Sequence, residues 1–282
     1  MKIIVLTSET PANIWLVNQL LSQHDIAGIV IERRPLALTP REKMERRRRM
    51  VKRYGLARTF NKLLFNQLRS RILSDSDSSA TRATFFPAGA PVAYSRQVPT
   101  LVVANVNDAD CRQFIRAQAP EVLAVCGTSV LKPEVFTLAP KGAINIHTGI
   151  TPEYRSADPI FWALYRGEPE KVGVTIHFID RGIDTGSIIH QETVPVYAGD
   201  SLTAISARCI RRGAELYSRA LAEIESGSVR TLDRPDVPSR AFFSVDLGLV
   251  QYLTFRWRFR RLASRLPREV VGRRAPAVEA RR

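Results

Sequence analysis

The chain opens with two apolar, strand-like segments separated by an amphipathic helix, and this order constrains the fold more than any other feature of the sequence. Residues 2–7 and 26–31 are short aliphatic runs, and residues 12–21 between them repeat apolar side chains at helical spacing. A strand, a helix and a second strand in this order form a parallel pair, because the helix returns the chain to the edge where it began. We therefore predict an α/β fold with a mostly parallel sheet. The turn at residues 8–11 contains no glycine, so it is not a glycine-rich phosphate-binding loop.

The formal charge of +15 is concentrated in two segments of the chain. Residues 33–71 hold 14 lysines and arginines against two glutamates, and residues 251–282 hold 10 arginines against two glutamates. The remainder of the chain is slightly acidic, so the overall charge says little about a binding pocket there. Three interpretations fit the basic segments: a solvated helical surface, a nucleic-acid contact that neutralises phosphates, or an arginine- and aromatic-rich surface for anionic lipids.

Both basic segments are predicted to be helical. In a basic insertion at residues 33–74, one helix begins at Pro40 and a second, amphipathic helix includes residues 56–68. A polar linker is expected at residues 74–80. Residues 242–266 have the pattern of another helix.

Two units follow from these segments. Residues 1–228 are predicted to be one α/β domain that carries the insertion and ends with a long helix, which Ser201 caps and Gly227 terminates. Residues 229–282 are predicted to be a helical C-terminal extension, and we expect its last residues, 267–282, to be a disordered tail.

The sequence favours a cytoplasmic location. The apolar start of the chain is too short for a signal peptide, and no apolar run approaches the ~20 residues of a membrane span. Cys111, Cys126 and Cys209 are odd in number and lack the spacing of a disulfide framework or a metal site. We therefore expect a cytoplasmic protein without a metal, peripheral to the inner face of the membrane if the basic segments bind lipid.

An amide, an imidazole and a carboxylate stand out in the middle of the chain. Asn145 and His147 are two residues apart on a predicted strand, so their side chains point to the same face. Asp184 follows a second alternating segment, residues 172–179, and open α/β sheets bind ligands beyond strand ends. An amide can bind a developing oxyanion, an imidazole can move protons, and a carboxylate can orient the imidazole. This trio therefore predicts acyl-group chemistry.

Each of these residues also has an ordinary structural interpretation. An isolated Asn-x-His most often caps a turn, and an aspartate before Thr-Gly is common turn chemistry. His177, on the alternating segment, is as readily a core histidine as a catalytic one, so it is left out of the trio. Cys126 has no basic neighbour and is better interpreted as a buried structural thiol than as a nucleophile.

Several motifs around the trio occur in a fixed order. They are Asn-x-His at 145–147, Pro-x-Tyr-Arg at 152–155, a tryptophan-bearing helix from Pro159, Gly-Val-Thr-Ile-His at 173–177 and Asp-x-Gly-Ile-Asp-Thr-Gly at 180–186. This order resembles the folate-dependent formyltransferase family, which includes methionyl-tRNA formyltransferase, glycinamide ribonucleotide transformylase and the amino-sugar N-formyltransferases. The resemblance is strong over residues 119–190 and extends to residues 1–32 and 98–225.

The resemblance implies a Rossmann-like fold with helices on both faces, 10-formyltetrahydrofolate as the formyl donor and a primary amine as the acceptor. Asn145, His147 and Asp184 match the catalytic trio of the family. The loop after residues 122–125 matches the wall of the folate pocket, where we expect backbone contacts. The predicted folate-binding residues are Cys126, Gly127, Thr128, Ser129, Val130, Leu131 and Asp180. The predicted substrate loop contains Thr148, Tyr154 and Arg155.

The substrate loop departs from the family in two places. Ser156 replaces the glycine that usually follows the arginine, and residues 148–152 replace the Ser-Leu-Leu-Pro of many members. Because this loop faces the amine in the family, the departures leave the acceptor open. Arg155 is expected either to hold the loop or to meet the substrate.

For the acceptor we favour a small, phosphate-bearing amine, namely an amino sugar on a nucleotide or lipid carrier. The basic insertion also resembles methionyl-tRNA formyltransferases, which makes tRNA the alternative partner. Residues after 225 have a helical pattern rather than that of the β-barrel domain of those enzymes. A non-catalytic binding protein on the same scaffold is a further alternative, which the intact trio disfavours. The helix at 242–266 offers an apolar side for a homodimer.

Overall fold

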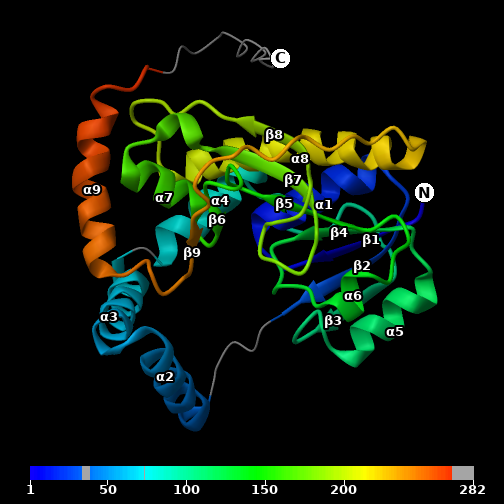
Figure 1. Ribbon diagram of the computed structural model, residues 1–282, viewed down its shortest axis with the longest axis horizontal. Helices are drawn as coiled ribbons and strands as arrows, with labels where there is room; N and C mark the ends of the chain where they lie inside the picture. The colour runs from blue at the N-terminus through cyan, green and yellow to red at the C-terminus, as the bar shows by residue number, and fades with distance from the viewer. Residues whose placement is uncertain (34–38, 73, 269–282) are drawn as a thin grey trace.

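The computed structural model describes residues 1–33, 39–72 and 74–268, in which a seven-stranded sheet forms the centre (Figure 1). The strands, in their order across the sheet, are β3 (Thr100–Val103), β2 (Ile26–Glu32), β1 (Ile3–Thr7), β4 (Val122–Cys126), β5 (Ala143–His147), β7 (Gly173–Phe178) and β8 (Ile188–Thr193). The first five of these run parallel. The strand order reverses between β1 and β4, which is where doubly wound sheets bind ligands.

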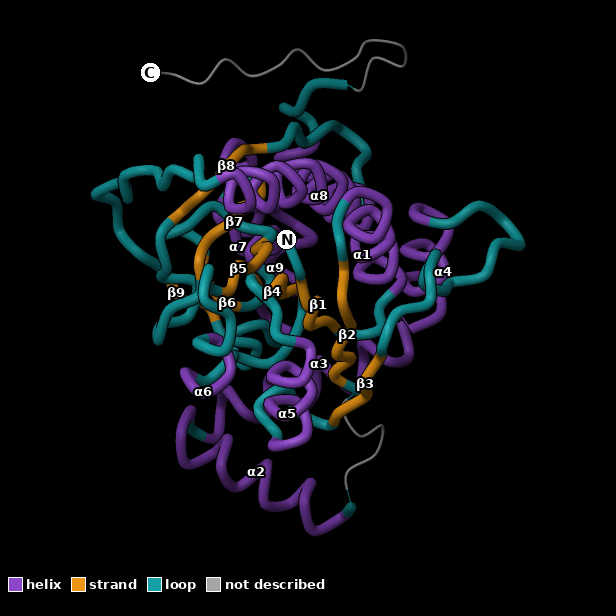
Figure 2. The backbone as a smooth tube through the Cα atoms, turned by 90° about the vertical axis from the view of Figure 1, so that its right-hand side faces the viewer, coloured by secondary structure: helices purple, strands orange, loops and turns teal. Residues whose placement is uncertain are grey.

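Helices lie on both faces of this sheet, as Figure 2 shows. The helices and the second, small sheet are α1 (Pro11–Gln23), α2 (Pro40–Tyr54), α3 (Leu56–Ile72), α4 (Ser74–Phe85), α5 (Ala109–Gln118), α6 (Pro133–Phe136), α7 (Pro159–Arg166), η1 (Pro169–Lys171), α8 (Leu202–Ser226), α9 (Leu249–Ala263), β6 (Arg155–Ser156) and β9 (Ala241–Phe242). The predicted Rossmann-like α/β fold is therefore confirmed. No helix among the residues that the structure describes is both long and apolar enough to cross a membrane.

The central strand β1 explains why the sheet is covered on both faces. Its residues Ile3 and Val5 pack under α1 and α8, whereas Ile4 and Leu6 pack against α5 and α6. All four side chains are almost completely buried. Each such side chain stabilises the fold by about 1.5–3 kcal/mol, so an aliphatic run without alternation suits a strand covered on both faces.

The basic insertion forms helices, as predicted. Helix α2 begins after Thr39, which forms a reciprocal capping box with Glu42. The linker predicted at residues 74–80 is wrong, because α4 includes these residues. Polar composition favours a loop there, but Phe85 at the end of α4 places its ring 5.3 Å from that of Trp15 on α1. This tertiary contact gives the helix a buried end.

The C-terminal extension contains a strand as well as a helix. The predicted helix at 242–266 is too long, because β9 pairs with β6 before α9 begins. Helix α9 packs on α7, with the rings of Phe255 and Phe161 4.7 Å apart. The predicted tail, 267–282, lies outside the described residues beyond its first two positions. The division of the chain at residue 228 stays a prediction. Ser201 and Gly227 do bound α8 as predicted.

Strand β7 runs antiparallel to β5, which changes how the aspartate reaches the site. The register pairs Asn145 with His177 and His147 with Thr175. The carboxyl end of β7 therefore lies away from the carboxyl end of β5, so the expectation that His147 and Asp184 follow neighbouring strand ends is wrong. The loop after β7 instead folds back along the sheet and brings Asp184 to His147.

Candidate active site

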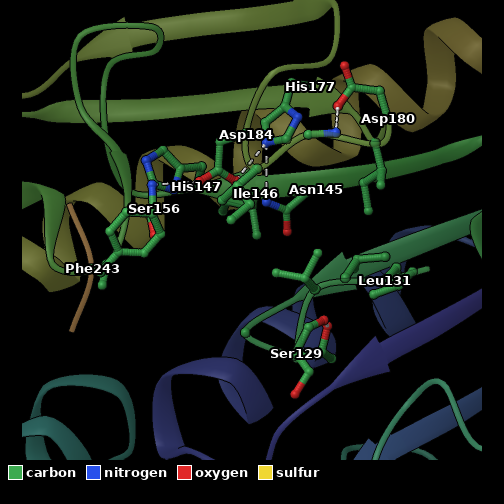
Figure 3. A pocket seen from close by; sticks show the side chains of 18 of the residues that line it. Ser129, Leu131, Asn145, Ile146, His147, Ser156, His177, Asp180, Asp184 and Phe243 are labelled. Carbon is green, nitrogen blue, oxygen red and sulfur yellow. Dashed lines mark hydrogen bonds and ion pairs between the residues drawn. The ribbon is translucent and has the colours of Figure 1, made fainter. Parts of the chain in front are cut away.

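A cavity of about 590 Å³ lies beside the carboxyl ends of β4 and β5 (Figure 3). Asn145, His147 and Asp184 all line it. Other lining residues from the predicted site are Gly127, Thr128, Ser129, Val130, Leu131 and Asp180. The structure therefore brings the predicted trio and most of the predicted folate wall together around one space.

Asn145 is oriented by His177, the histidine left out of the predicted trio. The side-chain nitrogen of Asn145 lies 3.2 Å from Nε2 of His177, and Nδ1 of His177 lies 2.8 Å from the Phe178 carbonyl oxygen. A carbonyl oxygen only accepts, so Nδ1 carries the proton and Nε2 accepts from the Asn145 amide. One N–H group of Asn145 is used in this way, which leaves the other for a ligand in the cavity.

His147 is a buried histidine whose two ring nitrogens have different roles. Its Nε2 donates to the Tyr154 carbonyl oxygen at 2.8 Å, so Nδ1 has the lone pair in the neutral ring. Burial lowers the pKa of His147 below its ordinary value of 6.5, against the opposing effect of Asp184. The neutral ring therefore predominates near neutral pH. Gly149 allows this packing, since a Cβ there would lie only 2.6 Å from Nε2.

Asp184 lies between the two histidines. Its Oδ2 is 3.6 Å from Nδ1 of His147, and its Oδ1 is 3.5 Å from Nε2 of His177. The backbone N–H of Ser156 donates to Oδ2 at 2.8 Å. Burial opposes ionisation, but the two histidines, which are positively charged in the acidic range where Asp184 titrates, and this N–H outweigh it and lower the pKa of Asp184 to about 2. Asp184 is therefore a carboxylate that can stabilise positive charge on His147.

The loop after β7 is held by its own side chains and by Arg155. Asp180 accepts hydrogen bonds from the Gly182 amide at 2.9 Å and from the Thr185 hydroxyl at 2.6 Å. Arg155 donates to the Ile183 carbonyl oxygen at 2.9 Å. Arg155 thus joins the substrate loop to the loop after β7, and a contact between Arg155 and the substrate stays a prediction.

The loop after β4 is held by hydrogen bonds to side chains that do not line the cavity. Glu32, buried at the end of β2, accepts from the Ser129 amide at 2.8 Å. The side chain of Asn107 donates to the Val130 carbonyl oxygen at 3.0 Å. Gly127 has a φ of 71° and passes so close to α1 that a Cβ would lie 2.5 Å from an asparagine side chain there. The cavity wall therefore has a backbone held in one conformation.

Four predicted site residues do not line the cavity: Cys126, Thr148, Tyr154 and Arg155. The Cys126 thiol is buried and donates to the Thr7 hydroxyl at 3.1 Å, and burial raises its pKa to about 11. The Tyr154 ring is also buried, and its hydroxyl donates to Glu168. Cys126 is the buried thiol that the sequence predicted, and a role for these four residues in ligand binding stays a prediction. The loop turns the tyrosine into the hydrophobic core, so that only its carbonyl group meets the site.

Three lining residues come from segments that the sequence did not assign to the site. Tyr54 ends helix α2 of the basic insertion, and Phe243 and Ser244 follow β9. The pairing of β9 with β6 places these two residues beside Ser156. No local pattern marks them, because their position depends on two very short strands that are far apart in the sequence.

A doubly wound sheet that brings an amide, a histidine and an aspartate into one cavity defines an α/β enzyme scaffold suited to acyl-group transfer. The formyl transferase family model matches residues 1–221. The chain therefore belongs to the formyl transferase family, an enzyme family whose formyl donor is 10-formyltetrahydrofolate. The resemblance found in the sequence is thereby confirmed.

Curated relatives are methionyl-tRNA formyltransferases. The chain is 37% identical over 144 residues to the one from Anaeromyxobacter sp. (strain K), which is 51% of this chain and 46% of the relative. It is 32% identical to the enzyme from Chlorobium limicola over 168 residues, and this alignment covers 58% of this chain and 52% of the relative. The chain spans about half the length of the curated relatives it matches.

Solved structures of the same fold come from enzymes with different acceptors. Glycinamide ribonucleotide transformylase 1 from Symbiobacterium toebii has a TM-score of 0.54 at 20% identity, covering 83% of this chain and 94% of that one. A sugar N-formyltransferase from a Shewanella species has a TM-score of 0.55 at 14% identity, covering 92% and 87%. At these identities the likeness concerns the fold.

The cavity has the properties that a folate donor requires. Its wall combines fixed peptide groups with the apolar side chains of Val130, Leu131 and Ile179, which suit a flat ring with hydrogen-bonding edges. Its volume lies within the range of about 300–1,000 Å³ that is typical of small-molecule sites. Residues 127–131 and Asp180, which line the cavity, are the predicted contacts of this ring system.

Ser156 provides a test of how the substrate loop is built. Its φ of 73° is left-handed, at a position where the family usually has glycine. We expect Ser156→Gly to be at least as stable as the wild type and Ser156→Val to lose about 1–2 kcal/mol, because a β-branched side chain is strained at this φ. Chemical denaturation of the three proteins checks this. Equal stability of the glycine and valine variants would contradict the left-handed backbone.

Proposed function

We propose that the protein transfers a formyl group from 10-formyltetrahydrofolate to the primary amine of a small, phosphate-bearing acceptor, namely an amino sugar on a nucleotide or lipid carrier. One observation carries this proposal. Asn145 and Asp184 lie between two ends of the cavity, with Ser129 and Leu131 at one end and Phe243 at the other (Figure 3). In this proposal the donor occupies the end at Ser129 and Leu131, the acceptor occupies the end at Phe243, and the trio lies between them.

Asn145 is placed to stabilise the oxygen of the formyl group. One N–H of the Asn145 side-chain amide is used by His177, which orients the other N–H toward the cavity. As the amine attacks, negative charge develops on the formyl oxygen, and a donor held in place stabilises it. Removing one such donor from comparable sites slows the reaction by about 10²–10³-fold.

His147 and Asp184 are placed to move the proton. The attacking amine forms a bond to the formyl carbon and must lose a proton, while the bond between that carbon and the donor nitrogen breaks. Nδ1 of neutral His147 accepts this proton, and the resulting imidazolium is stabilised by the carboxylate 3.6 Å away. The proton then passes to the leaving nitrogen, so the enzyme returns to its starting state.

The acceptor end of the cavity supports a small acceptor. Phe243 supplies an apolar ring face at this end, Ser244 follows it in the chain, and Ser156 and Tyr54 also line the cavity. Aromatic faces with a few hydroxyl groups are typical of sites for small ring-shaped ligands. The pairing of β6 with β9 holds this end together.

Initiator tRNA is the second candidate acceptor. It is favoured by the names of the curated relatives and by the exposed arginines on α2, Arg46–Arg49, which could neutralise phosphates. The two candidates differ in size and in salt dependence, so one assay separates them.

The assay incubates the protein with 10-formyltetrahydrofolate and a panel of amines: nucleotide-linked amino sugars, glycinamide ribonucleotide and methionyl initiator tRNA. Mass spectrometry reads the gain of a formyl group. We expect formylation of an amino sugar, and none with the Asn145→Ala protein as the matched control. Formylation of the tRNA alone would favour the second candidate. Stable donor binding without turnover on any acceptor would contradict the enzymatic proposal and favour a binding protein.

A further inference from the structure

Helices α2, α3 and α9 lie along one edge of the molecule (Figure 1), and α3 and α9 expose several large apolar side chains there. Five large apolar side chains on α3 and α9 are more than half exposed: Leu56, Phe60, Val250, Leu253 and Trp257. Single exposed apolar residues are normal on a protein surface, but a group of this kind marks an interaction surface.

The five side chains lie on two adjoining stripes. Leu56 and Phe60 are one turn apart on α3, and the three residues on α9 repeat at i, i+3 and i+7. The stripes adjoin where the Val250 amide donates to the side chain of Asn61, the residue after Phe60, at 3.1 Å. We name the outer surface of α2, α3 and α9 the edge surface.

Positive charge surrounds the apolar stripes. Helix α2 exposes Arg46–Arg49, and none of these four has a carboxylate partner among the residues that the structure describes. Helix α9 exposes Arg256 and Arg260. Arg261 lies 3.9 Å above the centre of the Trp257 ring. Tryptophan and arginine side by side on a helix are typical of segments that lie in a membrane–water interface.

We propose that the edge surface docks on an anionic lipid bilayer. Among the available occupants, a bilayer matches both properties of the surface, because its acyl boundary accepts the apolar side chains while its headgroups attract the arginines. A second copy of the chain would place these arginines against one another. A nucleic acid would match the charge but would leave the leucine, valine and phenylalanine side chains without a partner.

Docking in this way has a consequence for the active site. Tyr54 is the last residue of α2, and Phe243 and Ser244 precede α9 by a few residues, so residues in or next to the elements of the edge surface also line the cavity. The acceptor would then be a lipid-anchored, phosphate-bearing amine. This consequence rests on the proposed function, whereas binding to the bilayer does not.

Sedimentation with lipid vesicles tests the proposal. We expect the full-length protein to bind phosphatidylcholine vesicles that contain about 30% phosphatidylglycerol at about 0.05 M salt, to bind them less at about 0.5 M salt, and not to bind phosphatidylcholine alone. The Leu253→Ser/Trp257→Ser protein and the Arg46→Gln/Arg48→Gln protein should each bind at least about tenfold more weakly. None of the four residues lines the cavity.

A matched control carries the same kinds of change elsewhere. Val102 on β3 and Arg116 on α5 are also exposed, and Figure 1 places both elements at the other end of the molecule from α9. Val102→Ser/Arg116→Gln should bind vesicles as the wild type does. Full binding by Leu253→Ser/Trp257→Ser, or no binding by the wild type, would overturn the proposal.

Two other outcomes would assign the edge surface to a different occupant and also overturn the proposal. One is a wild-type dimer in sedimentation velocity that becomes a monomer in the Leu253→Ser/Trp257→Ser protein. The other is tRNA binding that Arg46→Gln/Arg48→Gln abolishes and Leu253→Ser/Trp257→Ser retains, without vesicle binding. If the vesicle test fails but the wild type and these variants still formylate a soluble amine, the membrane proposal is wrong and the proposed formyl transfer stands.

Discussion

Replacing His147 with alanine is expected to slow formyl transfer by about 10²–10⁴-fold, because the variant lacks the nitrogen that takes the proton from the amine. The neutral ring is held with its Nδ1 toward Asp184 by the hydrogen bond from Nε2 to the Tyr154 carbonyl oxygen. Single-turnover rates with saturating donor measure the effect on the chemical step. Asn145→Ala should show a comparable loss of about 10²–10³-fold, since it removes the donor to the formyl oxygen.

A suitable control is His190→Ala. His190 lies on β8 and pairs with Glu223 at 2.9 Å, outside the cavity lining. This variant removes a partly buried histidine that has a carboxylate partner, and its rate should stay near that of the wild type. A His147→Ala protein that melts cooperatively but transfers formyl groups at the wild-type rate would refute the role of His147.

The pH profile offers an independent check on the same residue. Burial lowers the pKa of His147 below 6.5, so its neutral form persists into mildly acidic solution. We therefore expect kcat/KM of the wild type to fall only as the pH drops below 6.5, as His147 becomes protonated. The His147→Ala protein should lack this acid limb.

Asp184→Asn is expected to have an effect as large as that of His147→Ala, because it keeps the shape of the side chain and removes its charge. Without the carboxylate, a proton on His147 is no longer stabilised, and the comparable change in a catalytic triad lowers kcat by about 10⁴-fold. The carboxylate also raises the pKa of His147, so any residual activity should have its acid limb at still lower pH. The measurements are the rate of transfer and its pH profile.

The same substitution should change how stability depends on pH. The pKa of Asp184 is about 2 in the folded protein and 3.8 as a reference value, so the folded protein binds this proton more weakly than the unfolded chain. Its contribution, about 2 kcal/mol, is present above pH ~4 and is lost as the pH falls toward 2. Asp184→Asn should therefore be less stable at neutral pH and should lose less stability on acidification.

Asp110→Asn is the control for this prediction. Asp110 is exposed in the first turn of α5, so its carboxylate has no buried partner to lose. Urea denaturation at a series of pH values compares the three proteins. If Asp184→Asn and wild type lost stability in parallel between neutral and acidic pH, the assigned role of the carboxylate in the folded state would be wrong.

The chemistry of the site was readable from the sequence because it depends on residue types at short range. Asn145 and His147 lie two apart on one strand, and they reach the same cavity as that spacing requires. The loop after β4 was likewise predictable, since it follows a buried parallel strand at the point where such sheets bind ligands. Ser201 and Gly227 bound α8 because their effects are local.

The positions of Asp184 and His177 in the site depended on contacts between segments that are distant in the sequence. Whether β7 runs parallel or antiparallel is decided by pairing with β5 and β8, and this direction determines how the loop with Asp184 reaches His147. His177 became part of the site through the same pairing, because it lies opposite Asn145. An alternating strand has the same pattern in either direction.

The residue patterns thus determined the α/β class and the formyl transferase family and predicted the trio, since periodicity and side-chain chemistry depend on residues close together in the sequence. Only the tertiary structure decided that Tyr154 enters the core, that Ser156 adopts a left-handed backbone and that Phe243 lines the cavity. It also decided that the apolar residues of α3 and α9 remain exposed. Burial is a property of the whole packed chain, because each side chain is covered or exposed by segments far from it in sequence.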